Sequence, residues 1–120
     1  MKKINKILNY THHTITILTE GGAICVPIHG TARCSVTRNS LKEIDMEGAK
    51  ISINETIFGK VANLPEEKND TIIIVSAIVA NVMTDSGRDD LYTVDEPVRE
   101  RGIIVGCRAL SKTTKYERMK

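Results

Sequence analysis

The chain has 120 residues, of which 41% are hydrophobic and 27% charged, a composition typical of a folded globular domain and not of a disordered chain. Aromatic residues make up only 3%, with no Trp, so the core must be aliphatic and the stacking platforms of single-strand nucleic-acid binders are scarce. The net charge of +2 is uneven, since residues 1–6 and 112–120 hold seven Lys/Arg and one acid, whereas residues 7–111 hold ten Lys/Arg and fourteen acids. We therefore predict a single domain, 1–120, with short basic tails at 1–6 and 112–120 and no nucleic-acid-binding face.

The sequence also predicts a cytoplasmic protein. No apolar run approaches the roughly 20 residues of a membrane-spanning helix, and polar residues interrupt the segment after the basic N-terminus, which argues against a secretory leader. The three cysteines, Cys25, Cys34 and Cys107, are odd in number and lack close spacing. This usage predicts reduced, buried thiols in a reducing compartment.

Short strands dominate the predicted N-terminal half. Alternating residues before and after the turn at Glu20–Gly22 predict a hairpin over residues 14–28. A strand over 32–38 then points Ala32, Cys34 and Val36 inward, and a further hairpin covers 44–53. Five or so short antiparallel strands between residues 14 and 61 predict a partial barrel or a strongly twisted antiparallel sheet.

The C-terminal half predicts a small strand–helix–strand unit. Residues 71–75 form a continuous apolar run, typical of a strand covered on both faces, and Ser76 is a helix N-cap candidate before a short apolar helix over 77–83. A strand over 91–94 is expected to end at Pro97, and residues 103–110 form the last strand, expected beside 72–75. The predicted fold class is α+β, with a β-rich first half followed by this unit. A helix that is apolar nearly all round also predicts self-association.

Catalytic and metal-binding motifs are lacking. His12 and His13 are adjacent and would point to opposite faces of a strand, His29 lies on a turn, and no zinc-ligand spacing occurs. Ser76 lacks the flanking glycines of a nucleophile elbow. We therefore predict a protein that is not an enzyme, with no metal and no cofactor.

Arginines are the more informative residues, because Arg holds phosphate in a bidentate manner. Six lie between the predicted tails: Arg33, Arg38, Arg88, Arg99, Arg101 and Arg108. Arg108 shares an apolar strand face with Ile104 and Gly106, so its charge must be paired or must line a pocket. An acid of the 85–90 loop and a ligand remain the two alternatives for its partner.

Several short segments together resemble a family of small phage and prophage proteins. These segments are YTHHTITI at 10–17, GTAR at 30–33, IVSAIVA at 74–80, RDDL at 88–91, PVR at 97–99 and IVGCRAL at 104–110. Chain size, cysteine usage and segment order also resemble the first type of Thoeris anti-defence sponge. The resemblance implies a phage- or prophage-encoded homo-oligomer that, in the bacterial host cytoplasm, sequesters cyclic ADP-ribose signals made by TIR enzymes.

No ligand-contact motif of the sponges can be placed on this chain, so the candidate ligand-binding residues come from chemistry. Arginines would hold pyrophosphate, the helix start a phosphate, an Asp the ribose hydroxyls, and a Tyr the adenine. These candidates are Arg33, Ser76, Arg88, Asp89, Tyr92, Arg99 and Arg108. Two other functions stay open: a cyclic-nucleotide phosphohydrolase that uses His12 or His13 with Asp89 or Asp90, and an inhibitor that binds a protein and no small molecule.

Overall fold

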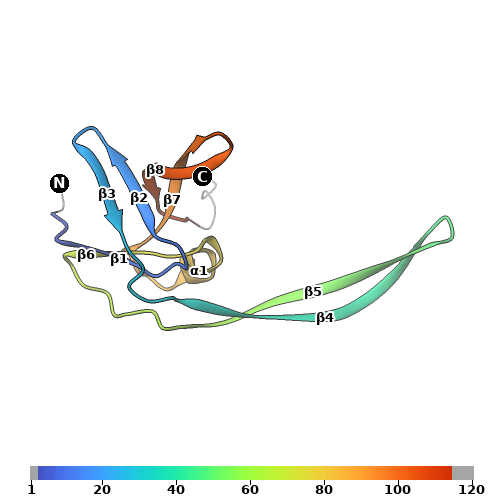
Figure 1. The fold of residues 1–120 in the computed structure, drawn as a ribbon. Coiled ribbons are helices and arrows are strands. Elements are labelled where there is room, and N and C mark those ends of the chain that lie inside the picture. Colours follow the sequence, from blue (N-terminus) through green and yellow to red (C-terminus); the bar gives the residue numbers. More distant parts are fainter. Residues whose placement is uncertain (1–2, 115–120) are drawn as a thin grey trace, which may run out of the picture.

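The computed structural model describes residues 3–114, and Figure 1 shows a β-rich body from which a long hairpin projects. The elements are β1 (Lys6–Asn9), β2 (Ile15–Thr19), β3 (Gly22–Val26), β4 (Arg33–Met46), β5 (Ala49–Ala62), β6 (Thr71–Ile74), α1 (Ala77–Val82), a 3₁₀ turn η1 (Met83–Asp85), β7 (Leu91–Glu100) and β8 (Ile103–Ser111). This arrangement confirms the predicted α+β, β-rich fold class.

Six strands form a nearly closed sheet in the order β1-β6-β7-β8-β2-β3. The strands β1, β6 and β7 run parallel, β8 is antiparallel to β7 and parallel to β2, and β3 returns antiparallel to β2. A backbone bridge between Asn9 and Ile28 joins the two ends of the order. Both halves of the chain therefore contribute three strands each to one partial barrel.

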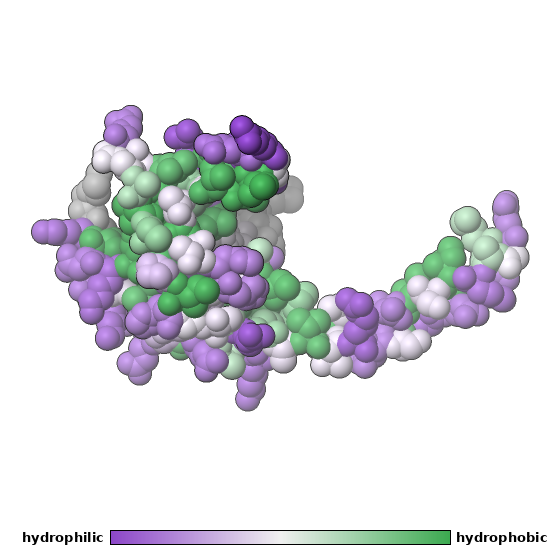
Figure 2. All heavy atoms as spheres, in the orientation of Figure 1, coloured by the Kyte–Doolittle hydropathy of each residue, from purple (hydrophilic) through white to green (hydrophobic). Residues whose placement is uncertain are grey.

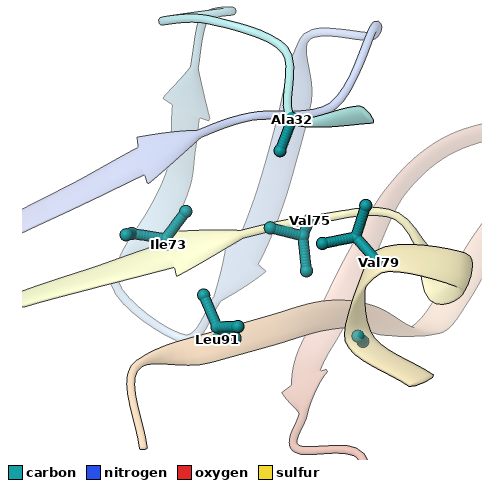
Figure 3. Packing of buried hydrophobic residues seen from close by; sticks show 6 residues of the cluster. Ala32, Ile73, Val75, Val79 and Leu91 are labelled. Atoms are coloured by element: carbon teal, nitrogen blue, oxygen red, sulfur yellow. The ribbon is translucent and has the colours of Figure 1, made fainter. Parts of the chain in front are cut away.

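Strand β6 contributes to two hydrophobic cores. Ile74 faces the inside of the barrel, where it belongs to a cluster with Ile15, Ile17, Val26 and Cys107. On the opposite side of β6, the second cluster packs beneath the helix α1, as Figure 3 shows; its members are Ala32, Ile73, Val75, Val79, Ala80 and Leu91. Burial on both faces explains why residues 72–75 are continuously apolar.

Strands β4 and β5 form an arm, here defined as residues 33–62, that leaves the body (Figure 1). Each strand has 14 residues, and they pair from Arg33↔Ala62 to Met46↔Ala49 at the tip. The expected series of short strands that curl into the barrel is therefore wrong for this segment. Val36, expected to point inward, is 48% exposed because nothing from the body covers the arm at that point.

The last two strands also differ from the expectation. β8 does not lie beside β6, because β7 separates the two strands. β7 continues through Pro97 to Glu100, and Pro97 lies opposite Cys107 of β8. Pairing of β6 with β7 ends at Tyr92, so the far edge of β7 has no β6 neighbour at Pro97 and the missing N–H is tolerated there.

Asn9 holds the closing point of the barrel together. Its side chain is fully buried, and its Nδ2 donates hydrogen bonds to the carbonyl oxygens of His13 at 2.6 Å and Val26 at 3.0 Å. Its Oδ1 accepts from the backbone N–H of Thr11 at 2.9 Å and from the Thr11 hydroxyl at 2.7 Å. One amide thus links β1, the loop before β2 and the end of β3.

The predicted basic tails lie only partly within the described residues, because residues 1–2 and 115–120 fall outside them. Lys6 is the first residue of β1, and the Lys112 ammonium forms an ion pair with Asp89. In the described part of the chain, no helix has the length and apolar character needed to cross a membrane.

Candidate functional site

The barrel opens into a groove of about 680 Å³ near the end of β6. Four segments line it: residues 11–16 before and within β2, residues 75–77 at the start of α1, residues 93–97 of β7 and residues 104–107 of β8. A volume of this size lies in the range of small-molecule sites. The long-range pairing of β2 with β8, at Ile17↔Cys107, brings the first and last of these segments together.

The groove combines apolar surfaces with hydroxyl groups. Ile15, Val75 and Cys107 are its buried apolar residues, whereas Val94 and Ile104 are about half exposed. Its polar side chains are those of Thr11, His13, Thr14, Thr16, Ser76, Thr93 and Asp95. Such a lining can make apolar contact with a flat ring and donate hydrogen bonds to oxygen atoms of a ligand.

Ser76 is the one sequence-predicted candidate that lies in this groove. Its backbone is extended, with φ −69° and ψ 161°, and its Oγ accepts a hydrogen bond from the backbone N–H of Val79 at 3.3 Å. This geometry confirms the predicted N-cap. Because one acceptor position of the hydroxyl oxygen is used by the helix, the hydroxyl can still donate to a ligand.

Cys107 contributes a protonated thiol to the groove at neutral pH. Burial raises the pKa of this thiol, and the nearby Asp95 carboxylate raises it further. Of the other two cysteines, which were also expected to be buried, Cys34 is half-buried and Cys25 is exposed. Cys25 lies on β3, where the first four of the five residues are exposed.

This difference predicts the order in which the thiols react. At pH 8, Cys25 should react with a maleimide or a disulfide reagent at least tenfold faster than Cys107, because the thiolate is the reactive form and Cys107 is both buried and harder to deprotonate. Peptide mass spectrometry after timed quenching measures both rates in one sample, with the denatured chain as the reference. Equal rates in the folded protein would contradict the buried position of Cys107.

A second hollow of about 350 Å³ lies between the end of α1 and residues 112–114. Arg88 lines it, but its guanidinium is held by Asp90 through Nε–Oδ1 at 3.0 Å and Nη2–Oδ2 at 2.8 Å. Lys112 hydrogen-bonds to Asp89, which raises the pKa of Lys112. The predicted ligand residues Arg88 and Asp89 are therefore engaged with protein groups here.

The other candidates are dispersed. Arg108 is exposed on β8, lines neither hollow, and has no hydrogen-bond or ion-pair partner within residues 3–114. Of the two alternatives for its partner, pairing with an acid of the 85–90 loop is therefore not formed. Arg99 donates to the Gly102 carbonyl at 3.4 Å in the β7–β8 turn. Arg33 is exposed at the base of the arm, and Tyr92 is half-buried on β7.

The residues of the alternative catalytic site are also separated. His13 lines the groove, whereas Asp90 is paired with Arg88 and Asp89 with Lys112 beside the other hollow. The rings of His12 and His13 contact each other edge to face at 5.3 Å between centroids. Among the residues that the structure describes, no group of three His, Cys, Asp or Glu is placed to hold a metal ion.

Comparison of the chain with protein-family models, with curated proteins and with solved structures finds no match.

Proposed function

We propose that the protein binds a nucleotide-derived signal of the cyclic ADP-ribose type in the barrel groove and sequesters it without cleaving it. The observation that carries the proposal is the groove of about 680 Å³ with hydroxyl groups spaced around apolar walls. The hydroxyls of Thr16 and Ser76 can donate hydrogen bonds to ribose and phosphate oxygens, whereas those of Thr11 and Thr93 already donate to Asn9 Oδ1 and to the Ser111 carbonyl oxygen. The apolar residues around them suit the face of a base.

Sequestration is favoured over turnover by the contacts of the groove. Catalysis by a side-chain nucleophile needs that group, a base and an orienting group within hydrogen-bond reach. Within residues 3–114, the His13 ring makes no hydrogen bond with Asp95 or with Ser76, and the Ser76 oxygen caps a helix. The lining thus supplies binding groups without a connected set for bond cleavage.

A variant that narrows the groove tests the proposal. Ala77 is an exposed residue of α1 that lines the groove, so Ala77→Trp should weaken binding of cyclic ADP-ribose at least tenfold by occupying the space of the ligand. Ile78 is its exposed neighbour outside the lining, and Ile78→Trp is the matched control. Titration calorimetry with cyclic ADP-ribose and a panel of cyclic dinucleotides measures the affinities, and heating of the complex should release the ligand intact.

The same titration tests whether Arg108 contacts the ligand. Arg108→Ala should weaken binding roughly tenfold to a hundredfold if this arginine holds a phosphate, and leave it unchanged if the ligand lies in the groove alone. A loss of affinity with Arg108→Ala and none with Ala77→Trp would move the site to the outer face of β8. No binding of any ligand in the panel would remove the proposed function.

Two alternatives give different results in these experiments. A phosphohydrolase would release a ligand whose mass has increased by one water. An inhibitor that binds a protein would bind none of the panel, and the arm is the feature of the fold that favours such an interface.

A further inference from the structure

The groove has one side chain that can carry a positive charge. Of the described residues that line it, His13 is the single basic one and Asp95 the single acid. The arginines of the β7–β8 hairpin lie outside the lining, Arg99 near the turn and Arg108 exposed on β8. Figure 2 shows mostly apolar residues over β2, β3 and the β7–β8 hairpin, with hydrophilic residues gathered at the hairpin tips. A phosphate in the groove would therefore have a histidine as its cationic partner.

The backbone of His13 is held by the buried junction where the barrel closes. Its carbonyl oxygen accepts hydrogen bonds from Asn9 Nδ2 at 2.6 Å and from the Thr11 hydroxyl at 3.0 Å. Its N–H donates to the Thr11 hydroxyl oxygen at 3.3 Å, and Asn9 is itself fully buried. Both polar backbone atoms of His13 are thus fixed to the core. A ring that starts from a fixed position loses less conformational freedom when it binds a ligand.

The imidazole ring of His13 keeps its nitrogen atoms for a ligand. All hydrogen bonds of this residue within the described chain use its backbone, and the ring contacts the neighbouring His12 ring edge to face, with 5.3 Å between centroids. His12 is the other titratable residue of this loop, and it lies outside the groove lining. A protonated imidazole has two N–H donors, and hydrogen bonds from a charged donor to phosphate are roughly twice as strong as neutral ones.

The remaining titratable groups of the groove leave the charge of His13 without a partner in residues 3–114. Asp95 reaches the groove from β7, and β8 separates β7 from β2, so Asp95 and His13 lie on elements that do not pair. Asp95 Oδ1 accepts the Glu96 N–H at 2.8 Å, and no ion pair joins Asp95 to His13. Cys107 on β8 stays protonated, because burial raises the pKa of its thiol. A phosphate can therefore supply the negative charge that a protonated His13 lacks.

We infer that His13 binds the phosphate oxygens of the ligand and that its protonation regulates the affinity of the groove. The inference rests on the proposed function and names the group that holds the ligand's charge. Histidine is the side chain whose charge ordinarily changes between pH 5 and 8. Binding therefore strengthens as the pH falls through this range. The Asp95 carboxylate repels phosphate from the β7 side, so the ribose hydroxyls of the ligand lie toward β7 and its phosphates toward the loop before β2.

Titration calorimetry with cyclic ADP-ribose at two pH values, about 5.5 and about 7.5, tests the role of His13. Cyclic ADP-ribose has no phosphate monoester, whose second proton titrates near pH 6, so its phosphates keep the same charge at both values. The wild-type protein should bind it about fivefold to tenfold more tightly at the lower pH, because most of the His13 population is then protonated. Adenosine, which has no phosphate, should gain no affinity at the lower pH.

Three variants assign the pH dependence to one ring. His13→Gln should bind cyclic ADP-ribose about tenfold more weakly at the lower pH and should no longer respond to pH. His12→Gln is the matched control, because it removes the adjacent imidazole outside the lining, and it should keep the pH dependence of the wild type. His13→Lys carries a positive charge at both pH values, so it should restore most of the affinity at the higher pH and should not respond to pH. A purely structural role of His13 would not produce this recovery.

Circular dichroism and thermal unfolding at both pH values show whether the variants are folded, as expected for an exposed side chain whose backbone makes the structural hydrogen bonds. Equal affinities of the wild type at the two pH values, or a pH dependence that survives His13→Gln, would overturn the role of His13 and leave the proposed function in place. Absence of binding at both pH values would overturn both.

Discussion

Replacement of Asn9 by Ala is expected to lower the free energy of unfolding by about 3–4 kcal/mol. The substitution leaves the Val26 carbonyl oxygen and the Thr11 N–H without the partner that Asn9 supplies, whereas the His13 carbonyl oxygen keeps a hydrogen bond from the Thr11 hydroxyl at 3.0 Å. Each polar group that loses its partner away from water costs about 1–3 kcal/mol, and Asn9 is fully buried. The loss also opens the contact between β1 and the end of β3, where the barrel closes.

Chemical denaturation followed by circular dichroism measures the effect, with Asn5→Ala as the matched control. Asn5 lies four residues before Asn9 and is exposed. Its side chain donates a hydrogen bond to the Asp70 carboxylate at 3.3 Å. Its replacement should change the free energy of unfolding by no more than about 0.5 kcal/mol. Similar values for the two variants would show that Asn9 does not hold the barrel closed.

Local patterns were sufficient for the elements that depend on neighbours in sequence. The hairpin of β2 and β3 follows from alternation on both sides of a glycine turn. The β6–α1 junction follows from an apolar run that ends at Ser76, whose side chain supplies the cap that its position predicts. In both places, the residues that determine the structure lie within a few positions of one another.

The arm could not be predicted in the same way. Ile51, Ile53 and Ile57 have the alternation of any half-buried strand, and this pattern does not say which chain covers the apolar side. A sequence read as a single compact molecule assigns that side to its own core. In the structure this apolar side of the arm is exposed. The segment was therefore correctly predicted to form strands, but wrongly expected to pack on the core of its own chain.

The groove was beyond prediction for a different reason. Its lining comes from four segments, which meet because β8 pairs with β2 and not with β6. Arg108 stood out as a charge on an apolar strand, but its neighbour Cys107 faces the inside of the barrel, so Arg108 lies on the exposed outer face of β8. Thr93 and Asp95 gave no signal, since a threonine and an aspartate on a strand are common at any surface.

Replacement of Arg88 is the second substitution for which we expect a large loss of stability. Arg88→Met should lower the free energy of unfolding by about 3–5 kcal/mol, because it leaves the Asp90 carboxylate, which is 1% exposed, without the guanidinium that binds both of its oxygens. Asp90 also holds β6 through its backbone, since the Ile73 N–H donates to the Asp90 carbonyl oxygen at 2.8 Å. An unpaired charge at this point would therefore disturb the loop where it joins the core.

A double-mutant cycle separates the pair from the unpaired charge. Arg88→Met combined with Asp90→Leu should recover most of the lost stability, because a buried ion pair and an apolar pair of similar volume often differ little in free energy. Lys112→Met is the control: it removes the exposed ion pair with Asp89 beside the same hollow and should cost less than about 1 kcal/mol. If Arg88→Met were as mild as Lys112→Met, the Arg88 guanidinium would not be needed by Asp90 and would be available to hold an anionic ligand in the hollow beside α1.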